Sequence, residues 1–316
     1  MDIGPSAYAR CELCPRRCGA RRLEGMPGLC GATATLRAAR SALHHWEEPP
    51  ISGEGGSGAI FFSGCPLRCV FCQNHEISQE GFGLEVSASR LARMMLELQE
   101  RGALNINLVT ALHFVPHVRE AIGLAREAGL ALPIVCNTSG YERPELVDEL
   151  SDLVDVWLTD FKYASPGLAA RLSAARDYPE VAAAALRQML GALRAHGGRR
   201  LAEDGSMQAG IIVRHLVLPG EVADSCAVLD LVWELCGNEV DLSVMNQYTP
   251  NSRCLAKGGD LARALTDEEY EEVLDHADDL GFEQLWWQQG GTVSESFVPA
   301  FDATGVDGPD LGDTRR

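Results

Sequence analysis

The chain has 316 residues, of which 46% are hydrophobic, and a formal net charge of −18. This length accommodates one large α/β domain, with or without a small module. The acidic balance excludes a duplex nucleic-acid binder, and the lack of a long apolar run or of a basic-then-apolar leader predicts a cytoplasmic protein without a membrane partner.

Composition divides the chain into three stretches. Residues 1–58 are rich in Cys, Gly, Arg and Pro and are expected to form a small Cys-rich N-terminal module. Residues 59–290 alternate short apolar runs with amphipathic stretches, which predicts a core domain of strands and helices. Residues 291–316 bear Gly, Asp and Pro and are expected to be a disordered tail.

The first group of cysteines lies in the N-terminal module, at Cys11, Cys14, Cys18 and Cys30. Four thiols within 20 residues match a complete tetrahedral zinc site or the ligand set of a second iron–sulfur cluster. The residues around them cannot build a core alone, so a metal cross-link is physically motivated. Four free thiols lining a loop remain the alternative, and the spacing does not choose between the metals.

Six short apolar runs in the core domain are predicted to be buried strands. They are Ala59–Ser63, Asn105–Thr110, Leu132–Asn137, Val154–Asp160, Gly210–Leu218 and Glu239–Met245. Helices are predicted over Ser87–Arg101, Pro116–Gly129 and Thr266–Leu280, the last with a capping box. This alternation predicts a parallel sheet in an open, partial (β/α)6 barrel, with its chemistry at the carboxyl ends of the strands.

The first of these strands leads directly into Cys65, Cys69 and Cys72, spaced C-x3-C-x2-C. Three thiolates on one tight loop can bind three corners of a 4Fe–4S cubane and leave one iron open, whereas ordinary electron-transfer clusters use four. The alternatives are a zinc knuckle, with His75 as a fourth ligand, and three incidental cysteines.

The run from Phe61 to Asn74, FFSGCPLRCVFCQN, resembles the motif of radical S-adenosylmethionine (SAM) enzymes, in the branch similar to pyruvate formate-lyase activating enzyme. The resemblance extends to about residue 290. It implies that the open iron chelates the amino and carboxylate groups of SAM and that a flavodoxin- or ferredoxin-type donor reduces the cluster. The cofactor is then cleaved to methionine and a 5′-deoxyadenosyl radical for hydrogen abstraction. Either a glycine in a partner protein or a small molecule is the implied substrate.

Strand four ends in Asp160-Phe161-Lys162, which resembles the Asp-x-Lys motif near the cofactor's carboxylate in glycyl-radical activating enzymes. Lys162 is one of only two lysines, and a compact ammonium suits a crowded carboxylate site; a surface lysine is the alternative. Arg214 in strand five resembles the Arg that pairs with the same carboxylate, with an internal salt bridge to Asp160 or Asp241 as the alternative.

The ends of strands two and three supply the remaining candidate cofactor contacts. Asn137 and Thr138 lie where activating enzymes carry Asp-Thr-Asn-Gly near the ribose or a cation, but Asn137 replaces the acidic residue. Strand two lacks the Gly-Gly-Glu that holds the methionine amino group in many of these enzymes, so Thr110 is expected to accept from that group. His113 either contacts the ligand or satisfies the end of the sheet.

Two functions of other classes compete with this interpretation. A non-catalytic iron–sulfur electron carrier gains nothing from an open iron, which argues against it. A zinc-binding structural protein would leave SAM unused.

Overall fold

The computed structural model describes residues 1–288 and 298–313. The strands form a ten-stranded sheet in the order β10-β9-β8-β6-β5-β4-β2-β1-β3, with β7 paired to β8. Their bounds are β1 Arg37–His44, β2 Ser57–Phe62, β3 Leu84–Glu85, β4 Ile106–Val109, β5 Ile134–Thr138, β6 Val156–Asp160, β7 Arg200–Leu201, β8 Met207–Leu216, β9 Asp241–Met245 and β10 Leu285–Trp287.

The six predicted strands correspond to β2, β4, β5, β6, β8 and β9, and adjacent members of this series all pair in parallel. The strand β10 extends the series in parallel beside β9. Because the two ends of the strand order, β10 and β3, do not pair with each other in the described residues, the sheet is not closed. The expected α/β fold with an open, mostly parallel sheet is therefore confirmed.

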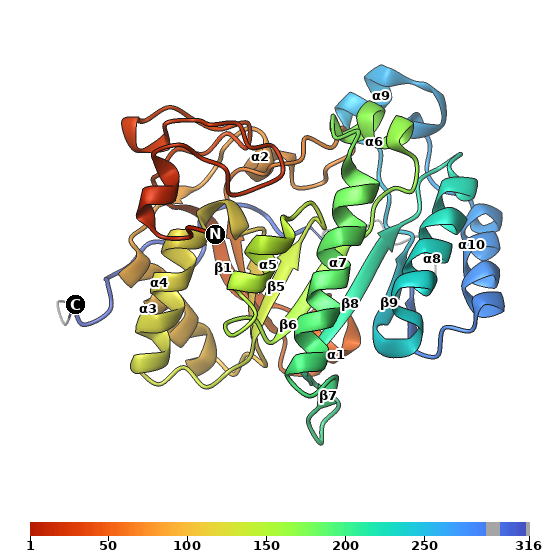
Figure 1. Ribbon diagram of the computed structural model, residues 1–316. Helices are drawn as coiled ribbons and strands as arrows, with labels where there is room; N and C mark the ends of the chain where they lie inside the picture. Colours follow the sequence, from red (N-terminus) through yellow and green to blue (C-terminus); the bar gives the residue numbers. More distant parts are fainter. Residues whose placement is uncertain (289–297, 314–316) are drawn as a thin grey trace.

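The helices of the described residues are α1 Pro49–Ser52, α2 His75–Ser78, α3 Ala88–Glu100, α4 Val115–Glu127, α5 Pro144–Glu149, α6 Pro166–Ser173, α7 Tyr178–Ala195, α8 Val222–Cys236, α9 Ser252–Lys257 and α10 Asp267–Leu280. Of these, α3, α4, α5, α7, α8 and α10 lie along one face of the sheet (Figure 1). The predicted helices match α3, α4 and α10, and Thr266 and Glu269 form the expected capping box. No helix in the described part of the chain combines the length and the apolar character needed to cross a membrane.

Part of the N-terminal stretch belongs to the core sheet, which the sequence did not predict. The strand β1, RAARSALH, pairs antiparallel with β2, although its Ala and Arg residues are poor strand formers. Burial of Ala38 and Ala39 against the sheet outweighs this propensity. Residues 1–36 lie outside the sheet, and their first 3-10 helix, Pro5–Tyr8, packs near α4.

Residues 298–313, which we expected to be disordered, pack along β1 and α3. The backbone N–H of Ser41 donates to Thr304, and the buried guanidinium of Arg90 donates to the carbonyls of Gly305 and Val306. The side chain of Val306 is fully buried. These contacts give the segment a fixed place despite its polar composition, and the rest of the expected tail lies outside the described residues.

Candidate functional site

The loop that follows β2 begins at Gly64, which has a φ of +88°. A Cβ atom there would come within 2.7 Å of the carbonyl oxygen of Cys30, so only glycine permits this approach. The backbone N–H of Gly64 donates to Ile77, and that of Cys65 donates to Cys30. The cysteine loop is thus fixed to the N-terminal segment on one side and to α2 on the other.

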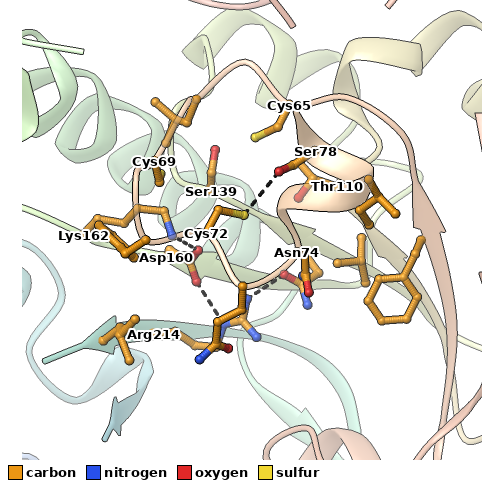
Figure 2. A pocket seen from close by; sticks show the side chains of 18 of the residues that line it. Cys65, Cys69, Cys72, Asn74, Ser78, Thr110, Ser139, Asp160, Lys162 and Arg214 are labelled. Carbon is orange, nitrogen blue, oxygen red and sulfur yellow. Dashed lines mark hydrogen bonds and ion pairs between the residues drawn. The ribbon is translucent and has the colours of Figure 1, made fainter. Parts of the chain in front are cut away.

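The thiols of Cys65, Cys69 and Cys72 line one cavity of about 220 Å³ above the carboxyl ends of the strands (Figure 2). The hydroxyl of Ser173 donates to Cys69 Sγ at 2.9 Å, and Ser78 Oγ lies 3.3 Å from Cys72 Sγ. Burial, reinforced by the neighbouring thiols, raises the pKa of Cys65 well above its usual range and raises the pKa of Cys72. These thiols would therefore become thiolates only beside a cationic group, such as a bound metal centre.

This donor set fits an iron–sulfur cubane better than a single zinc ion. In the described residues, no three Cys, His, Asp or Glu side chains converge on one ion position. A cubane takes one thiolate per iron, so its ligands need not converge in this way. His75, the alternative fourth zinc ligand, bonds to Glu80 at 3.1 Å and does not line the cavity.

In the same cavity as the thiols, Asp160 pairs with two cations (Figure 2). Lys162 Nζ lies 2.5 Å from one carboxylate oxygen of Asp160, and Arg214 Nε lies 3.0 Å from the other. Burial opposes ionisation of Asp160, but the two cations outweigh it and lower the pKa of the carboxyl. The side chain of Lys162 is only 19% exposed, which is inconsistent with the alternative of a surface lysine.

The guanidinium of Arg214 has a polar partner at each nitrogen. Besides Asp160, it donates to Glu47 at 3.2 Å and to Asn137 at 2.7 Å. The internal salt bridge considered from the sequence is therefore present, and its partner is Asp160 because Asp241 pairs with Arg199 instead. The site is a connected network of charges in which Arg214 is the central donor.

Of three remaining residues predicted to contact the cofactor, one lines the cavity and two do not. Thr110 lines the cavity, as expected for a cofactor contact. His113 does not: its Nε2 lies 2.9 Å from the carbonyl of Ser63, which matches the alternative of a satisfied sheet end, and burial lowers its pKa to about 3. Thr138 also points away and donates to the buried Glu142.

Several residues that line the cavity were missed by the sequence reasoning. Glu47 arrives from the segment between β1 and α1 and accepts from Asn107 and Asn137. Asn74 and Ser78 follow the cysteine loop (Figure 2). The available signal was the quoted motif, of which Asn74 is the last residue and which Ser78 closely follows, whereas no pattern in the sequence marks Glu47.

The N-terminal cysteines gather in one segment beside the cysteine loop. Cys11 and Cys30 are buried, and a Cβ atom on Gly28 would lie 3.3 Å from the sulfurs of both Cys18 and Cys30. The guanidinium of Arg22, which is 1% exposed, lies 3.6 Å from Cys11 Sγ. These contacts place thiols close together, although here too no three ligand side chains of the described residues converge on one ion position. A metal bound by these cysteines stays a prediction.

Metal analysis of the purified protein tests this prediction. We expect metal beyond the about four irons of one cubane, either about four more irons for a second cluster or about one zinc. The double variant Cys11→Ala, Cys14→Ala should lose this extra metal and have a lower Tm, whereas Cys226→Ala on α8 should change neither. A double variant that retained both its metal content and its Tm would rule out the N-terminal site.

Comparisons with known proteins agree with this geometry. A sequence profile of the Radical SAM superfamily matches residues 59–225. An uncharacterized protein of Methanocaldococcus jannaschii is 28% identical over 295 residues, covering 90% of this chain and 79% of the relative. A pyruvate formate-lyase-activating enzyme of Listeria monocytogenes is 28% identical over 138 residues, covering 41% of this chain and 56% of that enzyme.

A solved structure extends the comparison to the fold. A radical SAM methyltransferase from Sphaerobacter thermophilus superposes with a TM-score of 0.50 at 14% identity, covering 74% of this chain and 67% of that one. At this identity the likeness concerns the fold alone. The profile, however, spans more than half of the chain and includes the cysteine loop and the strands β4, β5, β6 and β8, so this chain belongs to the radical SAM superfamily.

Proposed function

We propose that the protein binds a 4Fe–4S cluster through Cys65, Cys69 and Cys72 and reductively cleaves SAM to methionine and a 5′-deoxyadenosyl radical, which abstracts hydrogen from a substrate. The observation that supports this most directly is the placement of three thiols on one loop, in the same cavity as the network of Asp160, Lys162 and Arg214. When bound, the cluster supplies the electron and an open iron for the amino acid part of SAM.

The residues of this chain would position the cofactor. The ammonium of Lys162 has three donors, of which one is directed at Asp160, so others are available for the carboxylate of SAM. Arg214 also lines this cavity and adds positive charge near the carboxylate of SAM. Thr110 can accept a hydrogen bond from the amino group of SAM. Asn137, although held by Arg214, lines the cavity where it can contact the ribose. The buried cavity walls would keep water from the radical.

The substrate and the electron donor are proposed from chemistry and similarity. A flavodoxin- or ferredoxin-type protein is the expected source of the electron, since the reaction consumes one electron for each SAM cleaved. The partial similarity to the Listeria monocytogenes activating enzyme supports a glycine in a partner protein as the substrate. A small molecule is the alternative, because the similarity covers only 41% of this chain.

Anaerobic reconstitution with iron and sulfide tests the function. The reconstituted protein should be brown and should convert SAM with dithionite into equal amounts of 5′-deoxyadenosine and methionine. An electron carrier would be brown and would take up the electron without cleaving SAM, and a zinc protein would be colourless. Either of those results would refute the proposed function.

Lys162→Ala should weaken SAM binding by about 1.5–3 kcal/mol, because it removes one charge-assisted hydrogen bond. The iron content should stay unchanged, since Lys162 is not a proposed ligand. Lys257→Ala is a matched control, because Lys257 is the other lysine of the chain and lies exposed at the end of α9. Equilibrium dialysis with labelled SAM measures both dissociation constants, and equal values would argue against a carboxylate contact at Lys162.

A further inference from the structure

A second cavity, of about 470 Å³, adjoins the first. It lies between the strands β8, β9 and β10 and the segment of residues 45–53, which includes α1. The two cavities have common walls at Trp46, Glu47, Arg214, Met245 and Gln247. A molecule in the second cavity would therefore lie next to SAM in the first.

The second cavity has buried acceptors that lack donors. Glu48 is only 9% exposed, and its Oε2 has no hydrogen-bond partner within the described residues. The same is true of Gln247 Oε1. Arg214 cannot easily supply the missing donors, because each of its nitrogens already donates to Asp160, Glu47 or Asn137. A buried acceptor without a donor is costly, so a ligand that donates N–H groups would relieve both positions.

The charges on these walls also favour a cation. Among the described residues that line the cavity, Glu47 and Glu48 carry carboxyl groups and His45 an imidazole, whereas Arg214 has the one guanidinium, which is shared with Asp160. Burial raises the pKa of Glu48 to about 7; Arg214 lowers it and Glu47 raises it further. A cation bound beside Glu48 would offset this effect of burial and favour the ionised form of the carboxyl.

Aromatic rings complete this cavity. The indoles of Trp46, Trp286 and Trp287 line it, and those of Trp46 and Trp287 are more than half exposed. Trp286 Nε1 donates to Asp241 at 3.1 Å, which fixes the orientation of that ring. Indole faces attract ammonium and guanidinium groups, and the combination of such faces with a carboxylate is typical of sites that recognise organic cations.

We propose that the second cavity binds the substrate through a guanidinium or ammonium group, and that Glu48 and Gln247 accept its hydrogen bonds. This proposal rests on the proposed function, because it assigns the substrate class of the same site. The cation would anchor the substrate below Arg214, while the carbon that loses hydrogen extends into the first cavity.

Binding of blocked amino acids to the anaerobic, cluster-containing protein with SAM tests this proposal. The probes are N-acetylarginine methylamide, N-acetyllysine methylamide and, as the neutral isostere of the first, N-acetylcitrulline methylamide. At least one cationic probe should bind about tenfold or more tightly than the citrulline probe by calorimetry, the usual worth of a charge-assisted bond. Equal affinities, or no detectable binding of any probe, would overturn the proposal.

Variants of the second cavity test which residues cause the preference for a cationic probe. Glu48→Gln keeps the shape of the side chain and should remove the preference for a cation, whereas Glu54→Gln, at an exposed position directly after this segment, should preserve it. Because Glu48 is buried, the Tm of each variant is measured as well, and Trp287→Ala provides a second variant at an exposed position. Trp287→Ala should weaken binding of the cationic probe. A cation preference unchanged in both Glu48→Gln and Trp287→Ala would contradict the assignment.

The assay separates this proposal from the proposed function. Cleavage of SAM without substrate measures the proposed function alone, and probe binding measures the cavity alone. Cation-selective binding by a protein that does not cleave SAM would refute only the former. Cleavage by a protein without cation selectivity would refute only the latter.

Discussion

Changing Cys65, Cys69 or Cys72 to Ala is expected to abolish SAM cleavage in each single variant. A cubane held by two thiolates is labile, so the iron bound at this loop should be lost together with the activity. The substitutions should leave the fold intact, because the loop is also fixed by backbone bonds from Gly64 to Ile77 and from Val70 to Leu172. Iron content, visible absorption and 5′-deoxyadenosine formation are the measurements.

The control for these variants is Cys226→Ala, which removes a partly buried thiol of α8 that does not line the cavity. It should retain wild-type iron content and cleavage. Any metal held by the N-terminal cysteines would remain bound in the three loop variants and in Cys226→Ala. The double variant Cys11→Ala, Cys14→Ala distinguishes this metal from the iron of the loop. Undiminished cleavage in any one of the three loop variants would refute the proposed cluster ligands.

The parallel part of the sheet could be predicted because its strands are buried on both faces. A run such as Ile60 to Phe62 has no polar alternation, and three of the six runs are followed by a predicted helix. The strand β1 could not be predicted in this way, because its Ala and Arg residues favour a helix and only pairing with β2 makes it extended. Its place in the sheet depends on contacts that are distant in sequence.

The site could be predicted where a residue lies at the end of a strand and has a distinctive motif, as for Asp160 and Lys162. Thr138 shows the limit of this reasoning. Both Asn137 and Thr138 lie at the end of β5, but only Asn137 lines the cavity, because the Thr138 hydroxyl is directed at the buried Glu142. Glu47 was missed because it comes from an irregular segment that only the folded chain brings beneath Arg214.

Glu47 completes a network of hydrogen bonds that orients Arg214. A guanidinium with partners at every nitrogen is held in one orientation by Asp160, Glu47 and Asn137 together. These partners come from β6, from the segment after β1 and from β5, so the network connects distant parts of the open sheet. The same contacts that stabilise the sheet would therefore position the charge for SAM, and disrupting one of them should affect both properties.

Asp160→Ala is expected to lower the free energy of unfolding by about 3–5 kcal/mol, the usual effect of breaking a buried ion pair by removing one partner. Asp160 is 14% exposed and is shared by Lys162 and Arg214, so its loss leaves two buried cations without their common carboxylate. The Glu239→Ala variant is the control, because Glu239 forms an exposed ion pair with Arg194 that should be worth at most about 1 kcal/mol.

The pH dependence of this difference identifies its electrostatic origin. The pKa of Asp160 is lowered in the folded protein, so its stabilisation is present above the ordinary carboxyl pKa and is lost as the pH falls through the folded-state value. The gap in stability between wild type and Asp160→Ala should therefore narrow on acidification. Anaerobic denaturant unfolding at several pH values measures it. A loss no larger than that of Glu239→Ala, or a gap that does not change with pH, would show that Asp160 does not stabilise the protein through these two cations.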